Sequence, residues 1–443
     1  MSSRRQRRTC HAGAALPLAL ATVLLLAPVA AAKTFVVNKR GDHPPNGCTK
    51  QDCTLREAVL RANARPGGDR IVLPSGKRPY RLTRVATLAG PDPTKGDLDL
   101  GNAINEAGNA VTIIHRGPGR ATIDASAAGD RVIELNGVAR LRKLVLRGGM
   151  SLASGGGVRS SGALSLIDAR VVGNQTGDAG GGVYANVGSV LVRNGVIRGN
   201  RAWDGGGVFA TSSTALTLRR STVAANRADP GSGGGIWLDS GAFVTTRIIA
   251  STLRLNRAET DGGAIRSAAA DLRIVNSTLA ANATDGRGGG IYAAPASLAS
   301  LNAVTIARNR ADADDGGVQS GGGIYADGGA DVVALRNSLV VRNRGTGAQV
   351  QECDAPAPVG IDSMGGNLIT TTAGGCDFLD HLEDIVAPKP RIGKLRRNGG
   401  PTATIGLRKA SPAINQGDGP AAPKRDQRGV RRRNPDIGAY ERR

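Results

Sequence analysis

Apolar and polar residues alternate in short runs between Gly155 and Arg344, and each run ends in Asn. Three of the runs are SLIDARVVGN, ending at Asn174, VLVRNGVIRGN, ending at Asn200, and LTLRRSTVAAN, ending at Asn226. Alternation with a period of two predicts β-strands, because successive side chains of a strand point to opposite faces. The apolar positions hold mostly Val, Ile and Leu, which favour strands. No window in this stretch has a period that predicts helical repeats.

A Gly-rich tetrapeptide precedes the runs and divides the stretch into repeats. It is GGGV, GGGI or GGAI, and it stands at residues 155–158, 180–183, 205–208, 233–236, 262–265, 288–291 and 321–324. The starts are 25, 25, 28, 29, 26 and 33 residues apart, and repeats of this length predict a solenoid. Each repeat holds two or three short strands and tight Gly or Asn turns, so we expect one coil of a parallel β-helix per repeat.

The Asn residues that end the runs are predicted to stack. Equivalent positions of successive coils lie ~4.8 Å apart, the spacing between neighbouring strands. A side-chain amide can donate to one neighbour and accept from the other, so we expect a structural ladder rather than a binding site. The ladder comprises Asn174, Asn200, Asn226, Asn256, Asn282, Asn309 and Asn343.

The regions that flank the repeats have a different character. Residues 1–32 combine four Arg, a short apolar stretch and Ala at positions 30 and 32, which predicts a cleaved signal peptide. Residues 33–109 hold one clear helix, CTLREAVLRANA at 53–64, with a capping box between Thr54 and Glu57. We expect this helix to close the first coil, because an open solenoid end exposes unpaired backbone. No other apolar run is long enough to cross a membrane.

The coils are expected to occupy residues 110–345, and residues 346–443 are expected to form the last coil and an irregular cap over it. GGNLI at 365–369 predicts one more coil, which carries Asn367. The basic run KRDQRGVRRR at 424–433 is expected to be a solvated loop.

The net charge indicates a class of partner, and the cysteine content indicates a cellular compartment. The formal net charge is +22, which favours an acidic polymer as partner. One of the five Cys lies in residues 1–32, and the even remainder suggests disulfides in an exported chain. Local pairing would join Cys48 to Cys53 and Cys353 to Cys376, one of three connectivities, and free thiols are the alternative.

Both ends and the repeats resemble known exported proteins. NGCTKQDCTLREAVLRAN followed by GGDRIVLPSG resembles the CSLREA domain of exported bacterial proteins, with Thr54 in place of Ser. RDQRGVRRRNPDIGAYE at 425–441 resembles the end of choice-of-anchor Q proteins. Repeats such as NRADPGSGGGIW at 226–237 resemble the GGAI/FxxN repeats of polymorphic outer membrane proteins, although the usual Phe is replaced. The resemblance implies a right-handed, single-stranded parallel β-helix of pectate-lyase-like architecture in a secreted, periplasmic or surface protein, and no known reaction.

Two repeated features could bind a ligand on one face of the solenoid. The residue after each Gly-rich tetrapeptide is aromatic in five repeats, namely Tyr184, Phe209, Trp237, Tyr292 and Tyr325, and it is Arg159 or Arg266 in two others. An outward aromatic stripe could stack on sugar rings; the alternatives are rings that stack on one another or point inward. An Arg directly follows five of the ladder Asn residues, giving Arg201, Arg227, Arg257, Arg310 and Arg344. These Arg are expected either to pair with Asp in the same loops or to bind a polyanion.

The longest repeat interval holds the candidate catalytic carboxylates, Asp312, Asp314 and Asp315. Clustered Asp can serve acid–base chemistry or bind Ca²⁺, and a solvated insertion is the alternative. The sequence has no Ser/His/Asp order, no Cys/His metal spacing and no phosphate loop, so no other metal or cofactor is predicted.

Three functions are compatible with these patterns. The first is adhesin-like binding of polysaccharide or another anionic polymer by the aromatic and Arg columns. The second is a polysaccharide lyase or glycoside hydrolase, which needs a carboxylate cluster in a groove. The third is a structural surface protein. Sequence-specific recognition of nucleic acid is not expected, because no recognition motif is present.

Overall fold

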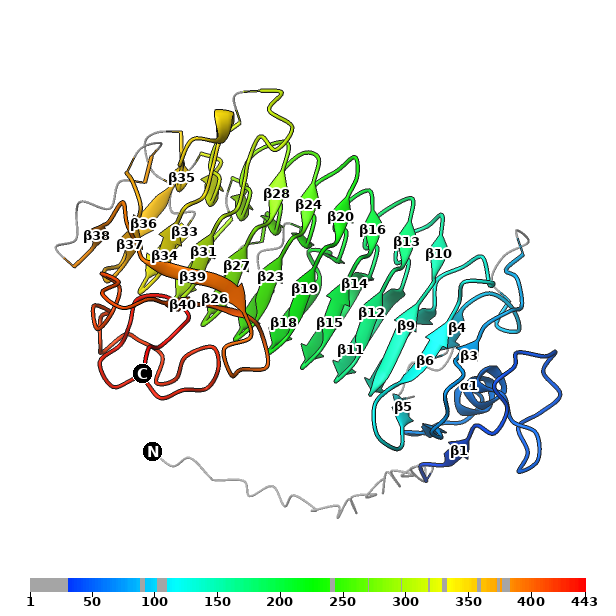
Figure 1. The fold of residues 1–443 in the computed structure, drawn as a ribbon. Helices are drawn as coiled ribbons and strands as arrows, with labels where there is room; N and C mark the ends of the chain where they lie inside the picture. The colour runs from blue at the N-terminus through cyan, green and yellow to red at the C-terminus, as the bar shows by residue number, and fades with distance from the viewer. Residues whose placement is uncertain are drawn as a thin grey trace, which may run out of the picture.

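The described strands wind into a right-handed parallel β-helix, which confirms the predicted fold class (Figure 1). The computed structural model describes residues 31–87, 92–101, 110–239, 244–269, 271–295, 297–317, 319–328, 333–356, 360–372, 375–376 and 383–443. Residues 1–30, most of the expected signal peptide, lie outside these ranges. Within the described part of the chain, none of the helices has the length and apolar character needed to cross a bilayer.

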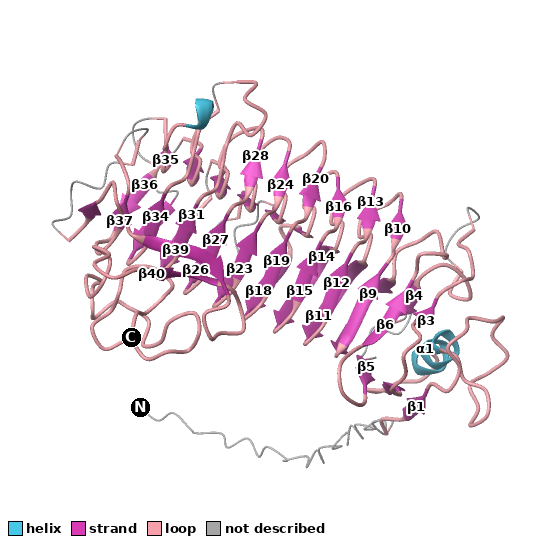
Figure 2. Ribbon diagram, in the orientation of Figure 1, coloured by secondary structure: helices cyan, strands magenta, loops and turns pink. Residues whose placement is uncertain are grey.

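Three parallel sheets form the walls of the solenoid (Figure 2), and among the described residues the third sheet has strands only in the coils from β10 (Met150–Ser151) to β28 (Ala283–Thr284). Sheet A contains β1 (Thr34–Val36), β2 (Arg70–Leu73), β4 (Leu98–Leu100), β5 (Ala110–His115), β7 (Ile133–Leu135), β8 (Val138–Arg142), β11 (Val158–Ile167), β14 (Val183–Arg193), β17 (Val208–Ala210), β18 (Thr214–Arg219), β21 (Ile236–Leu238), β22 (Thr245–Ile249), β25 (Ile265–Ser267), β26 (Asp271–Val275), β29 (Ile291–Ala293), β30 (Ala299–Asn302), β32 (Ile324–Ala326), β33 (Val333–Arg336), β35 (Cys353–Asp354) and β36 (Ile361–Ser363). Sheet B contains β3 (Tyr80–Arg81), β6 (Ala121–Asp124), β9 (Leu144–Arg147), β12 (Arg170–Val172), β15 (Val196–Arg198), β19 (Thr222–Ala224), β23 (Thr252–Arg254), β27 (Thr278–Ala280), β31 (Thr305–Ala307), β34 (Leu339–Val341), β37 (Leu368–Ile369) and β38 (Ile385–Val386). Sheet C contains β10 (Met150–Ser151), β13 (Gln175–Thr176), β16 (Arg201–Ala202), β20 (Arg227–Ala228), β24 (Arg257–Ala258) and β28 (Ala283–Thr284).

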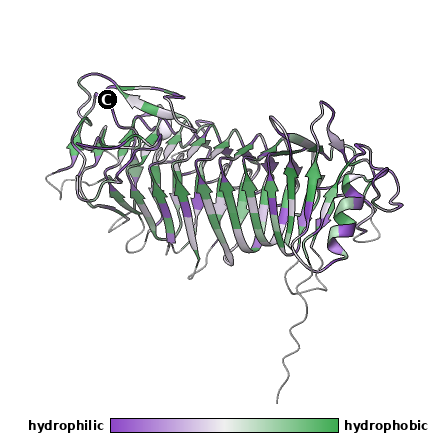
Figure 3. Ribbon diagram, turned by 90° about the horizontal axis from the view of Figure 1, so that it is seen from below, coloured by the Kyte–Doolittle hydropathy of each residue, from purple (hydrophilic) through white to green (hydrophobic). Residues whose placement is uncertain are grey.

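Strand alternation places one apolar row of each sheet inside the solenoid. In β18, Thr214, Leu216 and Leu218 are buried, whereas the residues between them are partly exposed. Figure 3 shows this alternation as green and lighter bands across the strands. The inward Val, Ile and Leu of successive coils form one continuous core from Phe35 to Ile369, so neighbouring coils stabilise one another by burying apolar surface.

The Asn ladder runs along one corner of the solenoid. Each amide nitrogen donates to the Oδ1 of the next Asn at 2.9–3.0 Å, from Asn174 to Asn343. Each Oδ1 also accepts the backbone N–H of the preceding Asn. Glu352 ends the ladder, because its carboxylate accepts both the backbone and the side-chain N–H of Asn343. Buried amides are therefore fully hydrogen-bonded along the corner.

A second, shorter ladder occupies the corner between sheets A and B. The backbone N–H of Ser221 donates to Ser251 Oγ, and that of Ser251 donates to Ser277 Oγ, both at 3.1 Å. Asn367 lies in this row, since its Oδ1 accepts the N–H of Ser338 at 2.9 Å. The predicted further coil is present as β37, and its Asn367 belongs to this second row and not to the Asn ladder, because it precedes a sheet B strand, whereas the ladder Asn residues follow one.

The N-terminal helix α1 (Leu55–Asn63) packs against β1, β2 and β4 at the blue end of the solenoid (Figure 1). Thr54 and Glu57 form the predicted capping box. Arg56 is buried and pairs with Asp42 at 2.8 Å, which fixes the helix to the loop that precedes it. Disulfides join Cys48 to Cys53 and Cys353 to Cys376, which confirms the local pairing.

The C-terminal segment, residues 383–443, first adds β38 to the end of sheet B and then lies along the flank of the solenoid instead of over its last coil. Its antiparallel hairpin, β39 (Ile392–Arg396) and β40 (Thr404–Leu407), crosses sheet B (Figure 1). Thr252 of β23 donates to the carbonyl of Ala403, and the N–H of Ala439 donates to Thr305 of β31. The expected cap over the last coil is therefore wrong. The outer face of sheet B carries Ala and Thr here, and the segment buries its own apolar core on that face.

The basic run at 424–433 is also less exposed than expected. Asp426, Gln427 and Arg432 are buried. Gln427 Nε2 donates to Thr252 Oγ1 and to the carbonyl of Ser251, and Gln427 Oε1 accepts from Thr278 Oγ1 at 2.6 Å. The run therefore anchors the segment to the solenoid through its buried residues.

Candidate functional site

A continuous column of large side chains follows the outer face of sheet A, and we call it the aromatic–arginine column. Strand register aligns one residue from each of seven successive strands. The members are Arg159, Tyr184, Phe209, Trp237, Arg266, Tyr292 and Tyr325. Their aliphatic neighbours, such as Val183 and Ala185, are buried, so the column side chains point away from the core.

The rings of the column stack on one another. The ring centroids of Tyr184 and Phe209 lie 5.5 Å apart, those of Phe209 and Trp237 lie 5.4 Å apart, and those of Tyr292 and Tyr325 lie 5.5 Å apart. Tyr184, Phe209 and Trp237 are partly exposed, whereas both later tyrosines are buried. The structure thus adopts the alternative of mutual stacking, and a ligand on the column would meet ring edges more than ring faces.

Arg266 fills the gap between the two aromatic groups. Its guanidinium carbon lies 4.1 Å from the ring centroid of Trp237 and 5.6 Å from that of Tyr292. A cation over these ring faces is attracted by the ring quadrupole. Sequence reasoning treated Arg159 and Arg266 as exceptions to an aromatic column, but the structure places both in it.

Acidic side chains from the adjacent loops accompany the column. Tyr292 Oη donates to Asp327. The pKa values of Asp261 and Asp204 are raised, chiefly by burial, and the positive charge of Arg266 offsets part of this rise. Arg287 lies over the ring of Tyr325 at 5.1 Å. The outer face of sheet A thus presents hydrogen-bond acceptors and guanidinium donors beside aromatic edges.

Carboxylates extend the column at its N-terminal end. Asp99 and Glu134 occupy the two preceding register positions, and Arg159 pairs with Glu134 at 2.6 Å. Oxygens of Asp97, Asp99 and Glu134 lie within 4.8 Å of one another. Burial is the main cause that raises the pKa of Asp97 to about 8 and that of Asp99 to about 6. Arg131 contacts Asp97 and Glu134, so guanidinium groups already balance this cluster. His43, Asp52 and Glu57 form a second group within metal-ligand reach.

The arginines that follow the ladder Asn residues belong to sheet C or its edge, not to the face of the aromatic rings. The prediction of one shared face is therefore wrong. The Gly-rich tetrapeptide separates the two columns and bends the chain, as at Gly205 with φ +60°.

Four of these arginines pair with acids. Arg201 and Arg227 contact Asp229, Arg227 also contacts Glu259, Arg257 contacts Asp285, and Arg310 contacts Asp315. Among the described residues, Arg344 has no ion pair. Of the two expectations for these arginines, the structure thus shows pairing with acidic side chains of the same molecule.

The three candidate catalytic Asp residues are engaged within their own loop. Asp312 is buried and accepts the N–H of Gly317 at 3.0 Å. Asp314 accepts the N–H of Gly316, and Asp315 pairs with Arg310. The three carboxylates do not form a metal-ligand group in the described part of the chain.

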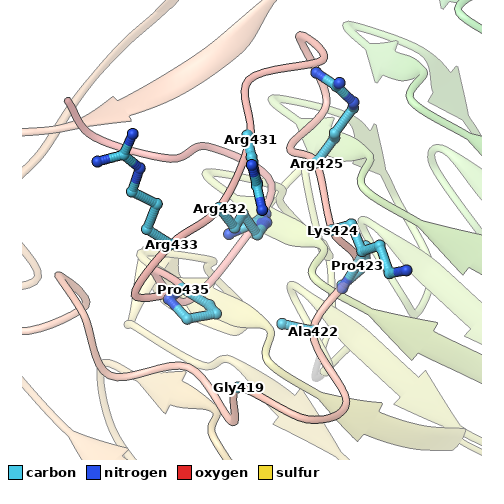
Figure 4. A pocket seen from close by; sticks show the side chains of 9 residues that line it. All are labelled: Gly419, Ala422, Pro423, Lys424, Arg425, Arg431, Arg432, Arg433 and Pro435. Atoms are coloured by element: carbon cyan, nitrogen blue, oxygen red, sulfur yellow. The ribbon is translucent and has the colours of Figure 1, made fainter.

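Two basic concavities involve the C-terminal segment. One, of about 560 Å³, is lined by Lys424, Arg425, Arg431, Arg432 and Arg433 among others. Figure 4 shows Arg425 and Arg433 on opposite sides of Arg431, which points towards Arg432. Arg432 donates to the carbonyls of Asp436 and Gly438, so its guanidinium serves the internal structure. The second concavity adjoins sheet B.

A family model described as the right handed beta helix region matches residues 147–370. The chain belongs to this right-handed β-helix family. A search of curated proteins finds no match. Among solved structures, this β-helix protein is similar to pectate lyase Pel9A, with 16% identity, a TM-score of 0.53 and coverage of 94% of this chain and 98% of that chain. It is also similar to a rhamnogalacturonan lyase, with 13% identity, a TM-score of 0.44 and coverage of 76% and 87%. At 16% identity the likeness to the pectate lyase shows the fold alone.

Sequence reasoning missed several residues of this β-helix protein that matter for its surface. Asp261 and Asp327 flank the rings but come from parts of their repeats other than the column position. The position after each Gly-rich tetrapeptide singles out Arg266 in the sequence, but only the structure shows its guanidinium between the rings of Trp237 and Tyr292. No sequence signal placed the C-terminal segment on sheet B, because its contacts join residues more than a hundred positions apart.

Proposed function

We propose that this chain is an exported β-helix protein that binds a polysaccharide, in the manner of an adhesin, along the aromatic–arginine column. The observation that carries the proposal is the column itself. It gathers five of the eleven aromatic residues of the chain in one line on the outer face of sheet A. Apolar surface gathered on the outside of a protein usually marks an interaction surface.

The chemistry of the column suits a sugar polymer. Ring edges and the partly exposed surfaces of Tyr184, Phe209 and Trp237 offer apolar contact, and Arg266 and Asp261 offer donors and acceptors for hydroxyl or carboxylate groups. Arg159 and Arg266 are four strand spacings apart, or roughly 19 Å. A ligand that reaches both must be extended along the solenoid, which favours a polymer over a monosaccharide.

Export and a second candidate function complete the proposal. The two disulfides fit an oxidising compartment, which supports export. A polysaccharide lyase or hydrolase on the same face is the second candidate, and Arg266 beside Asp204 and Asp261 is the observation that favours it.

The test compares the two Trp residues of the chain. The full chain is applied to an array of neutral and acidic polysaccharides, and the best ligand is titrated against Trp237→Ala with Arg266→Ala. We expect the double variant to bind about tenfold more weakly, which is the loss of roughly 1.4 kcal/mol. Trp203→Ala removes an exposed Trp outside the column and should bind as before.

Equal losses for the column variant and for Trp203→Ala would contradict the column as the binding surface. Release of unsaturated oligosaccharides would replace binding with a lyase reaction. If the chain binds none of the polysaccharides, the binding proposal fails and the role of a structural surface protein is favoured.

A further inference from the structure

The second basic concavity lies where the C-terminal hairpin meets sheet B, and we call it the sheet B groove. It has a volume of about 460 Å³ and is lined by Arg170, Arg198, Arg254, Arg396 and Arg397 together with smaller residues. Three of these arginines extend from strands of sheet B, and two come from the hairpin and its turn. Two segments that are distant in sequence therefore bring five guanidinium groups to one groove.

Strand register sets the positions of the arginines on the sheet. Val172, Arg198, Ala224 and Arg254 are successive register partners. Arg198 and Arg254 are thus two strand spacings apart, or roughly 10 Å. Val196 and Thr222 continue the neighbouring row from Arg170. Small and aliphatic side chains form the floor of the groove, and the guanidinium groups surround it.

The groove differs from the sheet C arginines in its lack of acidic partners. No Asp or Glu is among the described residues that line it, and none of its five arginines has an ion pair among the described residues. On sheet C, by contrast, Arg227 contacts both Asp229 and Glu259. Like charges this close repel unless counter-charges are present. A concentration of unpaired guanidinium groups is therefore favourable when an anion occupies the space between them.

The charge of the whole segment strengthens this field. Residues 383–443 contain fifteen Lys and Arg but six Asp and Glu. A groove lined by one sign of charge attracts ligands of the opposite sign over a distance. The hairpin wall of the groove belongs to this basic segment, so an approaching polyanion is directed towards it.

We propose that the sheet B groove binds an acidic polysaccharide through its carboxylate groups. Planar guanidinium groups bind carboxylates with paired N–H donors. The groove volume falls within the range of ligand sites, roughly 300–1,000 Å³, and its open form admits a stretch of a longer chain. No aromatic side chain is among its described lining residues. Single-stranded nucleic acid sites combine positive charge with aromatic stacking, so the groove suits an acidic glycan better. The site is separate from the aromatic–arginine column on sheet A.

The test measures binding of the full chain to polygalacturonate, to its neutral methyl ester and to a single-stranded oligonucleotide. Arg198→Gln with Arg254→Gln removes two groove cations. Arg227→Gln with Arg257→Gln is the matched control, because it removes the same charge from sheet C. We expect the groove variant to bind polygalacturonate about tenfold more weakly and the control to change binding by less than about twofold. Binding of the methyl ester should not differ between the variants.

Arg396→Gln with Arg397→Gln tests the same groove from the exposed hairpin, without a change to the strands of sheet B. It should weaken polygalacturonate binding as well. Trp237→Ala alters the sheet A column only, so groove binding should persist in that variant and the two proposals can fail separately. Equal losses in the groove and sheet C variants would reduce the effect to net charge and overturn the assignment. Tighter binding of the oligonucleotide than of polygalacturonate would replace the glycan with nucleic acid.

Discussion

At the scale of single residues, the second glycine of each tetrapeptide is fixed by close backbone packing. A Cβ on Gly206 would lie 2.4 Å from the carbonyl oxygen of Arg227 in the next coil. No L-residue other than glycine fits such a distance without movement of the backbone. The third position is less strict, because Ala264 occupies it in one repeat. The tetrapeptide is therefore a packing requirement of adjacent coils.

The residue before each ladder Asn shows a different constraint. Gly199 has φ +63° and open space around its Cβ position, and Ala225 holds the equivalent position at φ +51°.

We expect Gly206→Ala to reduce the free energy of unfolding by about 3 kcal/mol. Gly199→Ala should cost about 1 kcal/mol, from the backbone conformation alone. Urea unfolding of both variants tests the difference, and equal losses would contradict the packing argument.

Glu352, at the end of the Asn ladder, makes the stability of the protein depend on pH. Burial is the main cause that raises its pKa to about 7 from an ordinary value of 4.5, although hydrogen bonds from Asn343 lower it. The folded state therefore holds this proton more tightly than the unfolded state. Its contribution to stability is complete below pH 4.5 and is lost as the pH rises through about 7.

We expect the free energy of unfolding to fall between pH 4.5 and 7 by at most about 1.4 kcal/mol per pH unit from this group. Glu352→Gln should remove that part of the slope, because the amide does not titrate. Chemical unfolding across this range measures both proteins. Identical slopes would show that Glu352 does not titrate in this window.

At the scale of elements, one buried amide makes several of the hydrogen bonds that hold the C-terminal segment on sheet B. Gln427 hydrogen-bonds to Thr252, Thr278 and Thr402. We expect Gln427→Leu to detach residues 383–443 locally, because it leaves buried polar groups without partners at about 1–3 kcal/mol each. Limited trypsin digestion should then cut this basic segment several times faster. Asn434→Ala, at an exposed position, is the control. Unchanged digestion of Gln427→Leu would show that the apolar contacts suffice.

Elements differ in how far the sequence predicts them. The coils and the helix follow from local patterns, since each repeat carries its own strand alternation and Thr54 with Glu57 marks the start of the helix. The Asn ladder follows from spacing, because residues at one repeat position must become neighbours. The flank position of β39 and β40 depends on the Ala and Thr surface of sheet B, which no local pattern of the segment reveals. For the same reason the sheet B groove was not predictable.

At the scale of the whole molecule, positive charge is distributed unevenly over the solenoid. Sheet C arginines are balanced by Asp and Glu, whereas the sheet B groove and the C-terminal segment carry the excess. The paired sheet C arginines lie outside both proposed binding surfaces, so no single sheet C arginine should dominate binding. We expect Arg257→Ala to change polysaccharide binding by less than about twofold. Abolished binding in a titration of this variant would place the ligand on sheet C and contradict both proposed surfaces.

The direction of the Asn ladder has a consequence for the length of the protein. Along the row every amide donates one N–H to the next Asn towards the C-terminal end and the other to a carbonyl of the preceding coil, and the row finishes at the carboxyl oxygens of Glu352, which accept from Asn343. A duplicated repeat placed between Asn200 and Asn309 would find an acceptor ahead and a donor behind. The rod could then grow or shrink by whole coils of ~4.8 Å, while Glu352 remains the terminator. Gene duplication within the repeats would change the reach of this protein without a new fold.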